Sequence, residues 1–143
     1  MSESLNSRSR KHVFFSLKLA AVIVGGSLLL TLARQQGWIG QDEVVRGYNV
    51  IMGLALAVYG NFLPKVMHEM PARTLQEATL AQGVGRVTSW SMTLAFLIWA
   101  ALWAFAPRDF AFAGSIVAVF ASVVVMFGYI AWKAGAGRAS RSD

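Results

Sequence analysis

The chain has 143 residues, of which 56% are hydrophobic and 14% charged, whereas soluble domains carry roughly 25% charged residues. The apolar residues come in blocks of about 20, the length that a helix needs to cross a bilayer, so no soluble domain of useful size remains. The net charge of +6 lies on basic residues clustered at block ends, which favours anionic headgroups over nucleic acid as their partner. The absence of Cys excludes disulfides and thiolate metal sites.

Four apolar blocks are expected to form membrane-spanning helices. In chain order they cover residues 13–33, 47–63, 87–106 and 110–132. The second and third blocks end at Pro64 and Pro107, and proline disfavours helical backbone in the residue before it. The first block exceeds the core of about 7–15 residues typical of a cleavable signal, so we expect it to be retained. The sequence predicts an all-α integral four-helix bundle over residues 13–133.

The polar segments are two tails, residues 1–12 and 134–143, and a middle loop, residues 64–86. Together with Lys133, these segments hold nine basic residues, whereas the two remaining loops hold three. Cytoplasmic loops carry the excess of Lys and Arg. We therefore expect a multi-pass protein of a bacterial inner membrane, with both tails disordered and cytoplasmic and the middle loop on the same side.

The middle loop contains Thr74-Leu75-Gln76-Glu77, which fits a capping box. A short cytoplasmic helix is therefore expected to begin at Leu75 and lead into the third block, with Gly83 and Gly85 allowing a break before it. Small residues at four-residue spacing predict helix-packing faces. These residues are Gly53 and Ala57 in the second block, and Gly114, Ala118 and Ser122 in the fourth.

Aromatic residues suggest two further roles. Near the predicted helix ends, where amphipathic rings prefer the headgroup layer, the sequence places Trp38, Trp90, Trp103 and Trp132. In the third block, Phe96, Trp99 and Trp103 recur at helical spacing. That stripe is typical of packing or lipid-facing aromatics, and the alternative is a site for an apolar or cationic ligand.

Two polar residues near block ends are candidates for function. Lys18 lies inside the first block, where a charge indicates either an intramembrane or ligand role or a side chain that snorkels to the headgroups. Asn61 lies in the second block, where its amide can bond a freed helix carbonyl or a neighbouring helix. Gly60 permits close approach there, and Pro64 is expected to stop the helix. The alternative is an ordinary helix end with a basic anchor.

Catalysis and proton-coupled export are not expected. The sequence has no Gly-rich phosphate loop, no His-Glu zinc pattern and no nucleophile elbow, and its two histidines, His12 and His68, are isolated. We therefore expect no enzyme, no metal and no cofactor. All seven carboxylates lie outside the four blocks. In size and span count the chain resembles the small multidrug resistance exporters, but these need an acidic group that titrates inside the bundle.

The segment from Gly60 to Lys65, Gly-Asn-Phe-Leu-Pro-Lys, resembles the Gly-Asn-x-x-Pro-Lys signature of the SdpI/YhfL membrane-protein family. In that family the signature closes a transmembrane helix. A polar cytoplasmic loop with an Arg-Thr element follows, and the next helix starts near a Trp. Arg73, Thr74 and Trp90 stand here in comparable order, and the resemblance covers roughly residues 48–106. The loop departs from the family's Gly-x-Arg-Thr-Pro-Trp-Thr-Leu run, of which Arg-Thr and a following Leu remain.

The resemblance implies an SdpI-like interaction module, because the best characterised member is an immunity protein that also holds a transcriptional repressor at the membrane. Immunity, signalling or envelope stress is the expected role, with a membrane protein, a cytoplasmic protein or a second copy as partner besides the bilayer. The implied binding residues are Gly60, Asn61, Pro64, Lys65, Arg73 and Thr74. Two alternatives remain open: an accessory or assembly subunit of a larger membrane complex, and a small-solute transporter.

Overall fold

The computed structural model describes residues 2–67 and 75–139, and its regular structure there is helical throughout. The helices are α1 (Ser2–Gln35), α2 (Gln41–Met67), α3 (Leu75–Phe105) and α4 (Arg108–Ala139). Each of the four predicted apolar blocks falls in a separate helix. The predicted all-α class is therefore confirmed.

The turn between α1 and α2 is built on Gly37, whose φ is 74°. Glycine takes this left-handed conformation without steric cost. The amide of Gly37 donates to the carbonyl of Arg34 at 2.9 Å, and the amide of Trp38 donates to the carbonyl of Ala33 at 3.0 Å. These two bonds form a Schellman motif, which satisfies the last carbonyls of a helix. The motif ends α1 and lets α2 return beside it.

The turn between α3 and α4 lies at Pro107, as the sequence predicted. The helix before it ends at Phe105 and the next begins at Arg108. The carbonyl of Pro107 accepts a hydrogen bond of 2.8 Å from the amide of Ala111. Proline has no N–H to donate, and its fixed φ suits a helix start. One residue therefore closes the first helix and opens the second.

The helices are longer than the predicted blocks. The helix α3 includes Leu75, whereas Thr74 of the predicted capping box lies outside the described residues, and the helix continues through Gly83 and Gly85 without a break. At the other end of the chain, α4 runs to Ala139, where a disordered tail was expected. Glycine costs a helix only about 1 kcal/mol relative to alanine. An established helix can absorb that cost because each added residue also gains a hydrogen bond.

The first helix begins at Ser2, well before the predicted start of the apolar block at Val13. The structure therefore describes residues 2–12 as helix, where the sequence predicted a disordered tail. Between Ser2 and Val24 the sequence has neither glycine nor proline. A helix that starts in the apolar block consequently meets nothing that stops it from extending into the polar residues.

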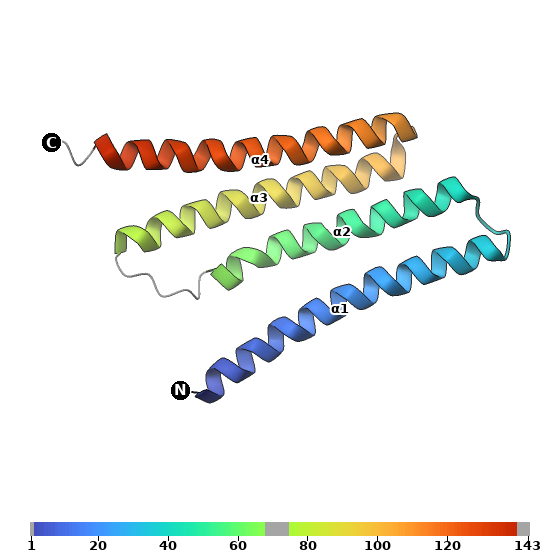
Figure 1. Ribbon diagram of the computed structural model, residues 1–143, viewed down its shortest axis with the longest axis horizontal. Coiled ribbons are helices and arrows are strands. Elements are labelled where there is room, and N and C mark those ends of the chain that lie inside the picture. The colour runs from blue at the N-terminus through green and yellow to red at the C-terminus, as the bar shows by residue number, and fades with distance from the viewer. Residues whose placement is uncertain (1, 68–74, 140–143) are drawn as a thin grey trace.

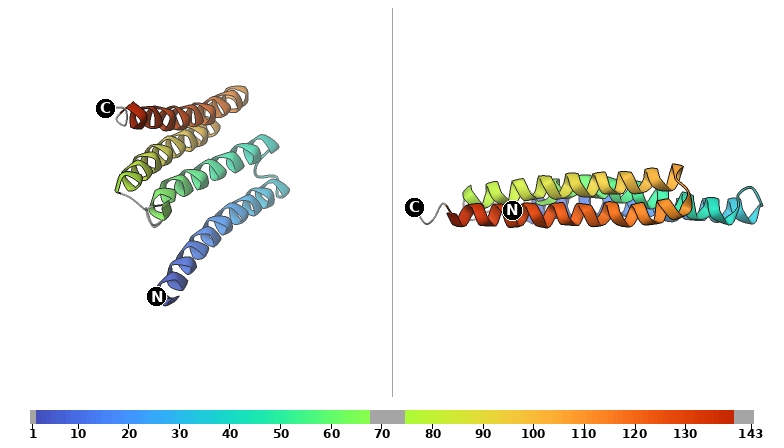
Figure 2. Two further views of the ribbon diagram at one scale, coloured as in Figure 1. Left: turned by 60° about the vertical axis from the view of Figure 1, so that its left-hand side comes forward. Right: turned by 90° about the horizontal axis from the view of Figure 1, so that it is seen from above.

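The four helices lie side by side in one antiparallel layer (Figures 1 and 2). Within the described residues, helix contacts join only α1 to α2, α2 to α3 and α3 to α4. Contact is most extensive between α2 and α3 and least extensive between α1 and α2. The predicted four-helix bundle is therefore not confirmed. We call the end with both chain termini the termini end, and the end with the turns at Gly37 and Pro107 the turn end.

Small residues hold α2, α3 and α4 together. A Cβ added at Gly53 on α2 would lie 3.1 Å from the Cβ of Ala100 on α3, and one at Gly114 on α4 would lie 2.8 Å from a methyl carbon of Leu102. The two predicted small-residue faces are therefore confirmed as packing faces against α3. The buried side chains are mostly alanine and serine: Ala55, Ala57, Ser89, Ala95, Ala100, Ala111, Ser115 and Ser122. Close backbone approach of this kind favours helix association in lipid.

Three helices are long and apolar enough to cross a membrane, over Val13–Gln35, Gln82–Phe105 and Arg108–Lys133. The chain is therefore a membrane protein by the length and composition of its helices. The second predicted span, residues 47–63, lies in α2, which is not among these three helices when the search is limited to the described residues.

Candidate functional site

The termini end contains the Gly60 segment that the sequence singled out. Gly60 is buried against α3, and a Cβ added to it would lie 3.3 Å from the Oγ1 of Thr93 and 3.5 Å from its backbone nitrogen. The hydroxyl of Ser89 donates to the carbonyl of Gly60 at 2.7 Å, and that of Thr93 donates to the carbonyl of Ala57 at 3.5 Å. Gly60 therefore allows the close approach that its lack of a side chain predicted.

Pro64 does not end α2, so the prediction that the helix stops there is wrong. The helix continues to Met67. Proline lacks an N–H, and in a helix this frees the carbonyl four residues earlier, which here belongs to Gly60. Ser89 on α3 supplies a donor to that carbonyl. Membrane helices tolerate proline where a neighbouring side chain satisfies the freed group in this way. We call the Pro64, Gly60 and Ser89 arrangement the proline joint.

Asn61 follows Gly60 and is exposed. The sequence offered its amide as a donor to a freed carbonyl, but the structure gives this role to Ser89. The next residue, Phe62, stacks on Phe15 of α1 with ring centroids 4.2 Å apart. Side chains on α1 and α3 thus hold the residues on both sides of Asn61.

The remaining predicted site residues lie apart from this joint or outside the described residues. Lys18 is exposed on α1, one turn beyond Phe15. The side chain of Lys65, and Arg73 and Thr74 altogether, lie outside the described residues. The structure consequently places Gly60, Asn61 and the Pro64 backbone in one stretch of α2.

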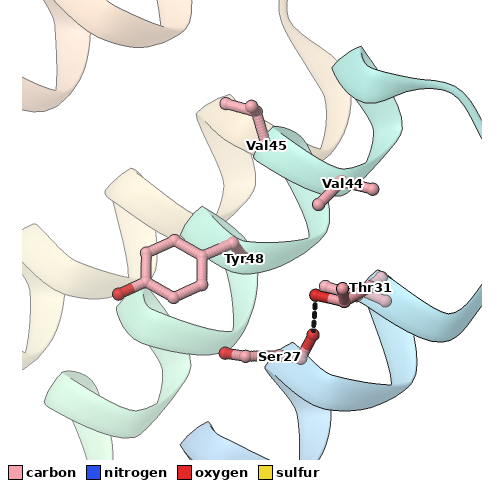
Figure 3. A pocket seen from close by; sticks show the side chains of 6 residues that line it. Ser27, Thr31, Val44, Val45 and Tyr48 are labelled. Atoms are coloured by element: carbon pink, nitrogen blue, oxygen red, sulfur yellow. Dashed lines mark hydrogen bonds between the residues drawn. The ribbon is translucent and has the colours of Figure 1, made fainter. Parts of the chain in front are cut away.

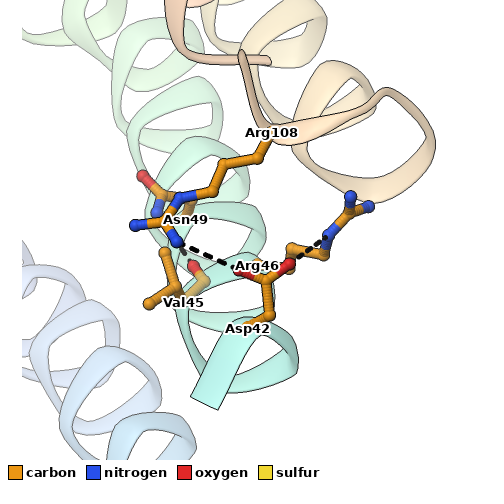
Figure 4. Close-up of polar contacts among 5 residues, drawn as sticks. All are labelled: Asp42, Val45, Arg46, Asn49 and Arg108. Carbon is orange, nitrogen blue, oxygen red and sulfur yellow. Dashed lines mark hydrogen bonds and ion pairs between the residues drawn. The ribbon is translucent and has the colours of Figure 1, made fainter. Parts of the chain in front are cut away.

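The turn end carries an ion cluster that the sequence analysis did not identify (Figure 4). Asp42, in the first turn of α2, accepts from the Nη1 of Arg108 on α4 at 3.2 Å and lies 3.7 Å from the Nε of Arg46. The three side chains are partly exposed, between 33% and 62%, and ion pairs at such positions contribute about 0–1 kcal/mol. Only the fold brings Asp42 and Arg108, 66 residues apart, together.

Beneath this cluster lies a cavity of about 250 Å³ between α2, α3 and α4. Its lining residues are Asn49, Trp99, Trp103, Phe112, Ser115 and Ile116. Trp103 is only 6% exposed, so it packs inside the layer and does not take the headgroup position predicted for it. Trp38, Trp90 and Trp132 are each at least 65% exposed, as such a position requires.

Both indoles in this cavity carry an unpaired donor. Within the described residues, the Nε1 atoms of Trp99 and Trp103 are buried and have no acceptor. Leaving a buried donor unpaired costs about 1–3 kcal/mol, and buried indole N–H groups usually find a partner. The predicted aromatic stripe is thus partly a packing element, but packing alone does not account for these two donors.

A second, smaller cavity of about 190 Å³ lies between α1 and α2 (Figure 3). Two of its hydroxyls are already paired within α1: the Ser27 hydroxyl donates to the Ile23 carbonyl at 2.7 Å, and the Thr31 hydroxyl donates to the Ser27 carbonyl at 2.8 Å. The cavity therefore offers an apolar surface with no free donor from these hydroxyls.

No metal centre emerges from the described part of the chain, where no three His, Cys, Asp or Glu side chains gather. In the comparisons with known proteins, the chain matched no protein-family model, no curated protein and no solved structure. The resemblance to the SdpI/YhfL family, carried by the segment from Gly60 to Lys65, therefore stays a prediction.

Proposed function

We propose that the chain is a non-enzymatic, SdpI-like interaction protein of a bacterial inner membrane, acting in immunity, signalling or envelope stress. In this proposal the layer crosses the membrane four times, both termini are cytoplasmic, and the termini end of α2 with the segment after it meets a protein partner. The proposal draws on the family resemblance and on the geometry around Asn61.

The place of α2 in the layer supports four crossings. The candidate spans of α1 and α3 lie on either side of α2, and α2 contacts both helices. A helix between two membrane-spanning neighbours in one antiparallel layer lies at the same depth as they do. The excess of basic residues at the termini end then points this end to the cytoplasm.

The observation that carries the proposal is the exposure of Asn61 beside a fixed piece of backbone. Gly60 is bonded to α3 through Ser89, and Phe62 is stacked on Phe15 of α1. Between them Asn61 is exposed. An uncovered polar side chain on a backbone that its neighbours hold is suited to recognise a partner, since little backbone entropy remains to be lost on binding.

Photocrosslinking from native membranes tests this function. A photoreactive residue is placed at Asn61 and, in a matched control, at Tyr59, which is also exposed and lies on another face of the same helix. We expect one discrete protein adduct from position 61 and none from position 59. The adduct should disappear when Lys65 is also changed to Ala. Adducts with lipid alone, or equal adducts from both positions, would contradict the proposal.

A second candidate function, an accessory subunit of a larger membrane complex, is favoured by α1. None of the residues in its candidate span is buried, and α1 contacts only α2 within the described residues. An uncovered outer helix can dock on another membrane protein. Purification in mild detergent separates the two functions: a stoichiometric membrane partner that is lost when large residues replace Gly25 on α1 would favour the subunit.

A further inference from the structure

The cavity at the turn end combines largely apolar walls with two unused hydrogen-bond donors. The unpaired Nε1 atoms belong to Trp99 and Trp103, which line it together from α3. Residues four apart in a helix lie on the same face, about 6 Å apart along the axis. Two unpaired donors of one kind therefore lie at neighbouring levels in the wall of the cavity.

Two other polar groups of the cavity donate hydrogen bonds inside their own helices. The hydroxyl of Ser115 donates to the carbonyl of Ala111 at 2.5 Å, and the Nδ2 of Asn49 donates to the carbonyl of Val45 at 2.8 Å. Each indole Nε1 exposes less than 1 Å² to solvent. A molecule in the cavity would therefore have to rotate the rings to reach these donors. Such a molecule has to bring hydrogen-bond acceptors.

The charges at the turn end favour an uncharged molecule. Here the sequence places three arginines and three carboxylates, which balance: Arg34, Arg46, Arg108, Asp42, Glu43 and Asp109. Within the described residues, Asp42 lies against both Arg46 and Arg108. Because the rim has no net charge, it selects neither an anion nor a cation.

The size and the opening of the cavity indicate where its ligand comes from. At about 250 Å³ it is below the roughly 300–1,000 Å³ of sites for drug-sized ligands, so it accepts a ring or an ester group and not a whole lipid. Phe112 and Ile116 on α4 are 62% and 53% exposed, and therefore one wall opens to the outer surface of the layer. In a membrane protein that surface faces lipid.

We propose that this cavity binds the carbonyl-bearing part of an uncharged apolar molecule taken from the bilayer, with the indole N–H groups of Trp99 and Trp103 as donors. Two sources supply this chemistry: the ester carbonyls of a glycerolipid and the ring carbonyls of an isoprenoid quinone. The site lies at the opposite end of α2 from Asn61, and it does not depend on the function proposed for that end.

Nuclear magnetic resonance of the full chain in lipid-depleted micelles tests the site directly. The ¹⁵N–¹H indole signals of Trp99 and Trp103 are assigned by single Trp→Phe substitutions. Three probes are titrated: a decyl benzoquinone, a diacyl phosphatidylcholine, and its dialkyl ether analogue, which has no carbonyl. We expect both signals to move downfield with the quinone or the diacyl lipid, which identifies the source. The signal of Trp90, an exposed residue near the middle of α3 and nine positions before Trp99, should stay in place.

Substitutions at the tryptophans provide a second test of the site. Trp99→Phe and Trp103→Phe should each weaken binding of the active probe about 2- to 10-fold, the effect of losing one hydrogen bond, whereas Trp90→Phe should leave it unchanged. Three outcomes would overturn the proposal: no shift with either carbonyl probe, equal shifts with the ether lipid, or equal affinity in all three variants. The shifts are read on the unsubstituted protein, so a variant that fails to fold leaves the test intact.

Discussion

The proline joint gives the sharpest test of how the termini end is held. Replacing Ser89 with Ala removes the hydroxyl that donates at 2.7 Å to the Gly60 carbonyl. Pro64 leaves this carbonyl without its helical partner, and the bond is buried. A buried group that loses its partner costs about 1–3 kcal/mol, and single interhelical hydrogen bonds in membrane proteins average about 0.6 kcal/mol. We expect Ser89→Ala to lower the free energy of unfolding by about 1–2 kcal/mol.

The dependence on Pro64 separates this reasoning from a general loss of packing. In a Pro64→Ala background the helix regains an N–H for the Gly60 carbonyl, so Ser89→Ala should cost only about 0.5 kcal/mol, the low end for a hydrogen bond. Reversible unfolding in mixed micelles measures the four free energies of this double-mutant cycle. Ser91→Ala is the matched control, because Ser91 bonds the Thr88 carbonyl of its own helix. Equal costs of Ser89→Ala in both backgrounds would refute the joint.

Two further predictions follow from the packing and the charges. Gly53→Ala should lower the free energy of unfolding by about 1–3 kcal/mol, because the new Cβ would lie 3.1 Å from the Ala100 backbone nitrogen. The control Gly128→Ala, which has open space around it, should raise the free energy of unfolding by up to about 1 kcal/mol. The same micelle assay measures both variants, and equal effects would contradict the packing of α2 on α3. Asp42→Asn should change stability by less than about 1 kcal/mol because its ion pairs are exposed, and a larger loss that persists in 1 M salt would show that the cluster is structural.

Pro64 and Pro107 show how far helix ends could be predicted from the sequence. Pro107 ends a helix as its local chemistry predicts, since the next residues begin a new helix and nothing has to replace the missing donor. Pro64 has the same local chemistry, but α2 continues because Ser89 donates from another helix. A sequence window around Pro64 does not contain that partner. Predictions that depended on local rules therefore succeeded where no tertiary contact intervened.

The same distinction applies to the candidate sites. The close approach at Gly60 followed from a residue type and was predicted. The side that Trp103 faces depends on where α4 lies, and the pairing of Asp42 with Arg108 depends on the return of the chain over 66 positions. Spacing in the sequence placed Trp99 and Trp103 on one face, but their unpaired donors became visible only with the neighbouring helices in place.

The side of the membrane on which the Asn61 end of α2 lies is the central claim, and thiol labelling tests it most directly. The chain has no cysteine, so a Cys introduced at Gln36 or at Thr74 is its sole thiol. In intact spheroplasts, a membrane-impermeant maleimide should label Gln36→Cys at once and should label Thr74→Cys only after lysis. Labelling of Thr74→Cys before lysis, with Gln36→Cys protected, would place the Asn61 end of α2 outside the cytoplasm and contradict the account.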